Sequence, residues 1–177
     1  MTRNTAIAIV GFMGCGKTAV AKILAAELKR EMVDLDQRIT NLQGRTPAAL
    51  ISEEGEQSFR SIETQTLDEL LQSGFEGVIS LGGGCWIQST NRALLAESRV
   101  MTVWIDTPFE VCWQRIEAAQ EVRPLARTKE QAKALFDRRR GIYELADIRI
   151  STSNESAEHI AEQVERAIRN KLANRFA

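Results

Sequence analysis

The stretch Ala6-Ile7-Ala8-Ile9-Val10-Gly11-Phe12-Met13-Gly14-Cys15-Gly16-Lys17-Thr18 decides the fold of this chain. Its first five residues are continuously apolar, as in a parallel strand that is buried on both faces. The next eight match the pattern GxxxxGK followed by Ser or Thr, whose glycines let backbone N–H groups turn inward around a phosphate chain. The pattern therefore predicts a strand, a phosphate-binding loop and a helix; the alternative is a plain glycine-rich turn.

Outward from this loop, strand and helix patterns alternate along the chain. We expect strands at 6–10, 32–33, 78–81, 100–105 and 148–150. We expect helices at 17–29, 37–43, 47–53, 56–72 and 90–97. Capping boxes at 107–110 and 128–131 predict two further helix starts, and the second of these helices runs to about 140. The spaced apolar positions 160, 164, 168 and 172 predict a last helix. Such alternation predicts an α/β layer fold with a mostly parallel sheet. Ligands bind beyond the carboxyl ends of such strands, which draws attention to the loops after residues 10, 33, 81 and 105.

Size and charge narrow the classes of protein further. The chain has 177 residues, about one domain, and a net charge of −1, which argues against a protein that coats nucleic acid. Its three cysteines, Cys15, Cys85 and Cys112, form no CxxC pair and fit a reduced compartment. No stretch approaches the ~20 apolar residues of a membrane span. We therefore expect a single cytoplasmic domain, 1–177, without a nucleic-acid or membrane partner.

The phosphate loop suggests an enzyme that uses ATP. Lys17 would reach the β- and γ-phosphates, and Thr18 would bind Mg²⁺. The guanine-specific NKxD motif and a DxxG switch motif are both absent, so a regulatory GTPase is disfavoured. A small phosphotransferase becomes the leading class.

Four weaker motifs each have a functional and a structural interpretation. Asp34 and Asp36 could divide work between metal and an acceptor hydroxyl, or Asp34 could cap a helix. Arg60 and Glu63 could serve a site or pair on a helix surface. The triplet 82–84 requires a close approach to its backbone or a positive φ, unless it is a plain turn. The arginine-rich segment 115–128 reads as a lid or as a solvated loop.

Taken together, the motifs resemble the shikimate kinase family. DxD, FRxxE, GGG, RPL and an Arg four residues before a Tyr occur in that family's order and spacing, over about residues 5–170. The resemblance implies a P-loop kinase fold, a three-layer sandwich with a five-stranded parallel sheet of order 2-3-1-4-5, a mobile lid at about 115–128 and a substrate-binding region at about 34–62. It implies transfer of the ATP γ-phosphate to the 3-hydroxyl of shikimate, a step of aromatic amino-acid (chorismate) biosynthesis.

The resemblance also implies roles for individual residues. The catalytic residues would be Lys17, Asp36 and Arg123. ATP would be bound by Gly14, Cys15, Gly16, Lys17, Thr18, Ala19, Arg115, Arg123 and Glu155, and shikimate by Asp36, Arg60, Gly82, Gly83, Gly84 and Arg139. Thr18 and Asp34 would hold one Mg²⁺ per subunit, bound with ATP. The expected partners are ATP and shikimate, and we expect a monomer.

Several points stay open at this stage. Arg139 is placed by Tyr143, but Gly141 stands where the family usually has proline, and Arg140 is the alternative. Trp86 is bulkier than expected beside the glycines. Cys15 is either a reactive thiolate in the loop or an inert inward-pointing side chain. The competing functions are another small-molecule P-loop kinase, for a sugar acid or a nucleotide, and a regulatory nucleotide-binding domain without catalysis.

Overall fold

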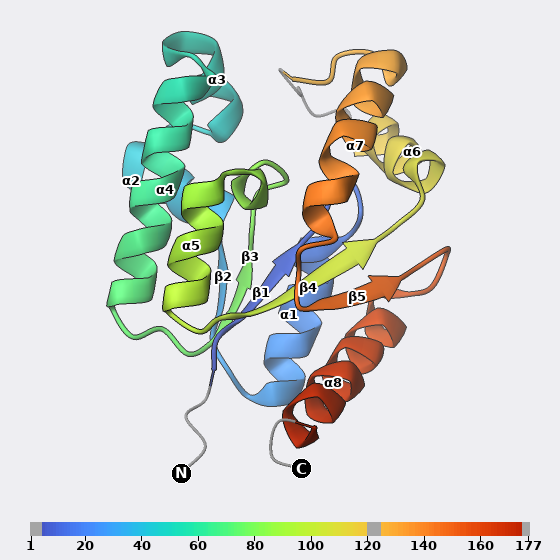
Figure 1. The fold of residues 1–177 in the computed structure, drawn as a ribbon. Coiled ribbons are helices and arrows are strands. Elements are labelled where there is room, and N and C mark those ends of the chain that lie inside the picture. The colour runs from blue at the N-terminus through green and yellow to red at the C-terminus, as the bar shows by residue number, and fades with distance from the viewer. Residues whose placement is uncertain (1–4, 120–124, 175–177) are drawn as a thin grey trace.

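One parallel sheet of five short strands forms the centre of the computed structural model, which describes residues 5–119 and 125–174 (Figure 1). The strands are β1 (Ile7–Val10), β2 (Met32–Asp34), β3 (Val78–Ser80), β4 (Met101–Asp106) and β5 (Ile148–Ser151). Their order across the sheet is β2-β3-β1-β4-β5, and every neighbouring pair is parallel. This confirms the expected fold class and strand order.

Helices connect successive strands and flank the sheet. They are α1 (Lys17–Leu28), α2 (Leu35–Gln43), α3 (Pro47–Glu54), α4 (Glu56–Gln72), the 3₁₀ turn η1 (Cys85–Ile87), α5 (Ser89–Glu97), α6 (Phe109–Ala119), α7 (Lys129–Tyr143) and α8 (Ala157–Ala173). The chain moves one way across the sheet from β1 to β2 and the opposite way in every later crossover. Because crossovers are right-handed, α1 lies on one face, and the helices between later strands lie on the other. α8 packs beside α1, which completes the three layers.

Burial follows from strand position. All residues of β1 and β4 are buried, as expected for central strands covered on both faces. β5 is an edge strand, and in it Ile148 and Ile150 are buried whereas Arg149 is exposed. Within residues 5–119 and 125–174, no helix has the length and apolar content needed to cross a bilayer.

The arrangement brings distant loops to one edge. Because all strands are parallel, the loop after β1, the start of α2 after β2, and the glycines after β3 meet at the carboxyl ends of the sheet. α4 and α7 stand on either side of these loops (Figure 1). Most of the motifs singled out in the sequence therefore converge at this edge.

Candidate active site

The loop between β1 and α1 has the geometry of a phosphate cradle. Gly14 and Gly16 adopt φ of 74° and 94°, which only glycine accepts without strain. A Cβ on Gly14 would also lie 2.5 Å from the Cys112 carbonyl oxygen. The Lys17 ammonium group lies inside the loop, where it donates to the Phe12 carbonyl at 2.8 Å. The Lys17 cation and the N-terminus of α1 therefore both favour an anion, such as a phosphate, bound in this loop.

The interpretation of Cys15 as an accessible reactive thiol is wrong. Its side chain is fully buried beneath the loop, with its sulfur 3.8 Å from the Lys17 Nζ. Cys85 and Cys112 are free and buried as well. Its backbone N–H donates to the Phe12 carbonyl at 3.3 Å and its own carbonyl accepts from the Thr107 hydroxyl at 3.3 Å, so the whole residue lies beneath the loop.

A cluster of oxygen atoms lies at the ends of α1, β2 and β3. The Thr18 hydroxyl donates to Asp34 Oδ2 at 2.8 Å and lies 3.2 Å from the Ser80 hydroxyl. The other oxygen of Asp34 accepts from the Gln37 N–H at 3.2 Å and caps α2. Both interpretations of Asp34 are compatible, because one carboxylate oxygen caps the helix and the other faces Thr18. Oxygen donors of this kind suit Mg²⁺, which keeps several waters and takes phosphate ligands.

Asp36 stands where two cavities meet. The larger cavity, about 660 Å³, is lined by the phosphate loop and Thr18, and the smaller, about 120 Å³, by Arg60, Arg139 and the glycines. Asp36 lines both of them. A carboxylate in this position can contact groups bound in either cavity.

The glycine triplet makes room for side chains. A Cβ on Gly82 would lie 2.7 Å from Asp36 Oδ1, and one on Gly84 would overlap the Arg60 guanidinium. None of the three glycines has a positive φ. Close approach of side chains therefore explains Gly82 and Gly84, whereas a Cβ on Gly83 would come no closer than 3.4 Å to its neighbours.

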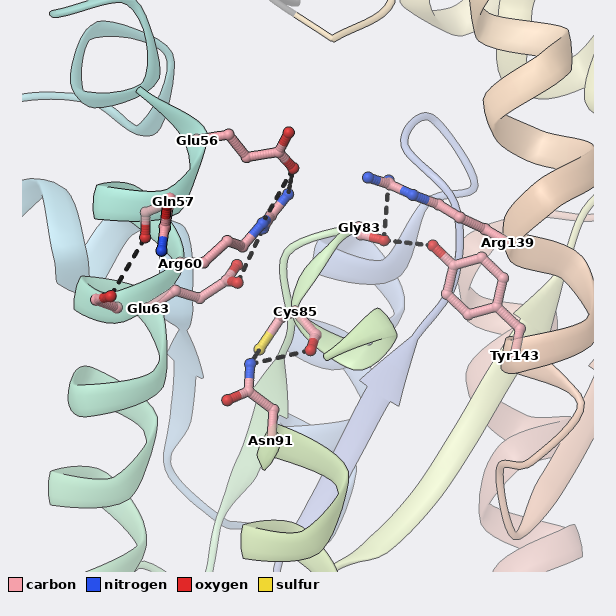
Figure 2. A network of polar contacts seen from close by, with 10 residues as sticks. Glu56, Gln57, Arg60, Glu63, Gly83, Cys85, Asn91, Arg139 and Tyr143 are labelled. Carbon is pink, nitrogen blue, oxygen red and sulfur yellow. Dashed lines mark hydrogen bonds and ion pairs between the residues drawn. The ribbon is translucent and has the colours of Figure 1, made fainter. Parts of the chain in front are cut away.

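Arg60 is held by two carboxylates of its own helix (Figure 2). It pairs with Glu56 at 3.1 Å and with Glu63 at 2.9 Å. Glu63 is buried, with a side chain 1% exposed, so the interpretation of this pair as a surface ion pair is wrong. Burial, opposed mainly by Arg60, raises the pKa of Glu63 to about 7. The second carboxylate oxygen of Glu63 is buried and has no hydrogen-bond partner among the residues that the structure describes.

The structure separates the two candidate arginines of α7. Arg139 is buried, lines the smaller cavity and donates to the Gly83 carbonyl at 3.1 Å (Figure 2). Burial lowers its pKa, and among the described residues it forms no ion pair with an acidic side chain. Arg140 turns away and pairs with Asp106 at 3.2 Å. Of the two, only Arg139 is placed to meet a ligand in this cavity.

Of the remaining predicted site residues, some line the two cavities and others do not. Arg115 lines the larger cavity and donates to the Gly14 carbonyl at 3.3 Å. Glu155 lines neither cavity, and its carboxylate accepts from the N–H and hydroxyl of Ser153. Arg123 lies outside the described residues. Leu125, from the segment expected to be a lid, lines the smaller cavity.

Trp86 does not narrow the smaller cavity, whose wall it does not join. Its indole N–H donates instead to the Ile142 carbonyl at 2.9 Å.

Sequence reasoning assigned no specific role to three residues that the structure places at the site: Ser80, Glu63 and Tyr143. Ser80 is the last residue of β3, which is a position at the ligand edge. Glu63 was visible only as the partner of Arg60. Tyr143 was used as a marker of register, whereas its hydroxyl contacts Gly83.

Comparison with known proteins identifies the family of this chain. The family model described as shikimate kinase matches residues 13–169. A shikimate kinase from Streptococcus thermophilus is 40% identical over 157 residues, covering 86% of this chain and 94% of that protein. One from Persephonella marina is 37% identical over 158 residues, covering 89% and 95%.

Solved structures show the same likeness. Shikimate kinase from Acinetobacter baumannii in complex with shikimate superposes with a TM-score of 0.88 at 34% identity, covering 94% of each chain. A gluconokinase from Sinorhizobium meliloti gives a TM-score of 0.66 at 14% identity, covering 99% of this chain and 98% of that chain. The second likeness shows a common fold only.

Proposed function

This chain belongs to the shikimate kinase family, and from that premise we propose how its residues perform the reaction. The chain transfers the γ-phosphoryl group of ATP to the 3-hydroxyl of shikimate, which yields shikimate 3-phosphate and ADP, in aromatic amino-acid biosynthesis. ATP occupies the larger cavity and shikimate the smaller, so that Asp36 lies between them.

One observation carries the assignment of the smaller cavity to an anionic substrate. Arg139 is a buried cation with no acidic partner among the described residues, and it faces a cavity that Arg60 also lines. An unpaired buried charge is costly, and a ligand carboxylate removes that cost. Each charge-assisted hydrogen bond to such a carboxylate contributes about 1.5–3 kcal/mol.

The chemical step then needs orientation and a proton acceptor. Asp36 orients the 3-hydroxyl and accepts its proton while the hydroxyl oxygen forms a bond to the γ-phosphorus. The bond from that phosphorus to the oxygen bridging it to ADP breaks, and Lys17 stabilises the negative charge on the phosphates. Gly14, Gly16, Thr18 and Ala19 contribute backbone N–H groups to the phosphates. The Cys15 N–H donates to the Phe12 carbonyl at 3.3 Å and would have to exchange this bond for one to a phosphate oxygen.

We assign Thr18 and Asp34 to one Mg²⁺ ion bound with ATP. When bound, the ion would neutralise phosphate charge. Thr18 and Asp34 already lie 2.8 Å apart, with Ser80 beside Thr18. The described residues contain no group of three or more His, Cys, Asp and Glu suited to a metal, which fits an ion that takes most of its ligands from phosphate and water.

Other parts of the proposal rest on the family. The family implies a lid at about 115–128 whose Arg123 would reach the phosphates; of this range the structure describes 115–119, the end of α6, and 125–128. Arg115 would stack on adenine, and Glu155 would contact the nucleotide's base. Residues 34–62 are the substrate-binding region, and Gly82, Gly83 and Gly84 contact the substrate. We infer that residues 1–177 act as one monomeric unit, and that the three free, buried cysteines reflect a reduced cytoplasm.

The discriminating experiment is an assay of ADP release with different acceptors. Shikimate should support turnover, whereas gluconate, nucleoside monophosphates and water should not. Turnover with gluconate in place of shikimate would favour a sugar-acid kinase of the same fold. Nucleotide binding without turnover on any acceptor would favour a regulatory domain.

A further inference from the structure

The carbonyl of Gly83 is held from α7 by two side chains. Arg139 Nη1 donates to it at 3.1 Å, and the Tyr143 hydroxyl donates to the same oxygen (Figure 2). Because residues 139 and 143 are four apart on a helix, both side chains leave the same face. A carbonyl oxygen has two lone pairs, and α7 occupies both of them.

Tyr143 is itself fixed in place. Its side chain is 2% exposed, and its ring stacks on Trp104 with centroids 6.0 Å apart and planes at 18°. Burial raises the pKa of the phenol well above its usual value, so the hydroxyl remains a proton donor throughout the neutral range. A rigid donor of this kind fixes the direction of the carbonyl that it binds.

The direction of this carbonyl determines where the next N–H points. In a trans peptide the C=O and N–H of one unit point in opposite directions, and the described residues contain no cis peptide bond. Because the Gly83 carbonyl points towards Arg139 and Tyr143 of α7, the Gly84 N–H of the same peptide points to the opposite side. The Arg60 guanidinium lies beside Gly84, close enough to overlap a Cβ at that position. Within the described part of the chain, this N–H has no protein acceptor.

We propose that Tyr143 is a positioning residue for the substrate's carboxylate. Without touching the substrate, its hydroxyl fixes the Gly83–Gly84 peptide and the Arg139 guanidinium that shares the Gly83 carbonyl. The cavity then presents a backbone N–H and a guanidinium in a fixed relation to one planar anion. This inference rests on the proposed function, because it concerns how the same cavity holds shikimate.

The first test removes one hydroxyl. Tyr143→Phe keeps the ring and its stack on Trp104, so we expect a folded protein. Loss of one hydrogen bond should raise the KM for shikimate about threefold to tenfold, while the KM for ATP stays within about twofold.

Thr102→Val is the matched control. It also removes one buried hydroxyl, which bonds to Asp147 at 2.9 Å at the far end of β4. The KM for shikimate should be unchanged in this variant, even if its stability falls.

A second test uses the natural side chain and does not depend on the Phe variant. Tyr143 is the chain's only tyrosine, so growth on 3-fluorotyrosine places a single fluorine reporter in the protein. Shikimate should shift the fluorine resonance. An analogue with a neutral hydroxymethyl group in place of the carboxylate should bind without this shift.

The possible outcomes separate the inference from the function. If the wild-type chain does not phosphorylate shikimate, the function and the inference both fail. If it does, an unchanged KM for shikimate in Tyr143→Phe, an equal rise in the KM for ATP, or an equal rise in Thr102→Val overturns the inference alone. Equal fluorine shifts with shikimate and the neutral analogue overturn it too.

Discussion

At the scale of single residues, the phosphate loop depends on one fixed positive charge. Lys17 is buried within the loop and bonds to the Phe12 carbonyl, so its ammonium group is positioned before nucleotide arrives. Lys17→Met should nearly abolish phosphoryl transfer, because the β/γ-phosphate charge loses its partner. We expect less than about a tenth of the wild-type kcat, a barrier change above ~1.4 kcal/mol, in the ADP-release assay. A variant that keeps more activity would show that Lys17 does not have this role.

The adjacent arginines of α7 allow a matched comparison. Arg139→Ala should raise the KM for shikimate at least tenfold, because it removes a buried cation from the cavity. Arg140→Ala should change that KM little, because Arg140 is half-exposed and pairs with Asp106. Steady-state kinetics of both variants decide the matter. A larger loss in Arg140→Ala would mean that the register is wrong by one residue.

At the scale of elements, local sequence patterns predict helix starts well only where tertiary contacts do not compete. Two Thr-containing boxes were expected to cap helices. Thr128 does cap α7, accepting from the Gln131 N–H at 3.3 Å. Thr107 does not cap α6; its buried hydroxyl lies 2.7 Å from the Thr152 hydroxyl, in the loop after β5. Nothing in the local sequence could show that partner, 45 residues away.

The cap of α7 leads to a stability prediction. Thr128→Ala removes the side-chain acceptor at the start of the helix that carries Arg139 and Tyr143. It should cost about 1 kcal/mol and lower Tm by roughly 2–4 °C in a domain of this size. Thr128→Ser, which keeps the acceptor, is the control and should restore most of the loss. Equal Tm values for wild type and Thr128→Ala would contradict the role of this cap.

At the scale of the whole molecule, sequence patterns predicted the sheet and the meeting of loops at its carboxyl edge, because both follow from strand–helix alternation. They did not predict burial within a helix. Arg60 and Glu63 are three residues apart, a spacing that also occurs in ion pairs on exposed helix surfaces. Only the packing of α4 beside the glycine triplet buries Glu63. For the same reason, Tyr143 could be recognised as part of a motif but not as a partner of Gly83.

The buried Glu63 couples this cavity to the stability of the whole fold. Its carboxyl ionises near pH 4.5 when unfolded and, because burial penalises the charge, near 7 when folded. Between these values the folded protein binds more protons than the unfolded chain. The contribution of Glu63 to the free energy of unfolding is therefore complete below about pH 4.5 and is lost as the pH rises through about 7.

The test compares wild type with Glu63→Gln, which has no proton to lose at this position. Thermal unfolding of the ligand-free proteins should be followed from pH 5 to pH 8. The wild-type Tm should fall relative to that of the variant as the pH rises, because only the wild type must bury a new charge. Arg60, which pairs with Glu63, stays cationic across this range and does not contribute a slope of its own. A Tm difference that stays constant with pH would show that Glu63 is already ionised at pH 5, and that Arg60 compensates its burial fully.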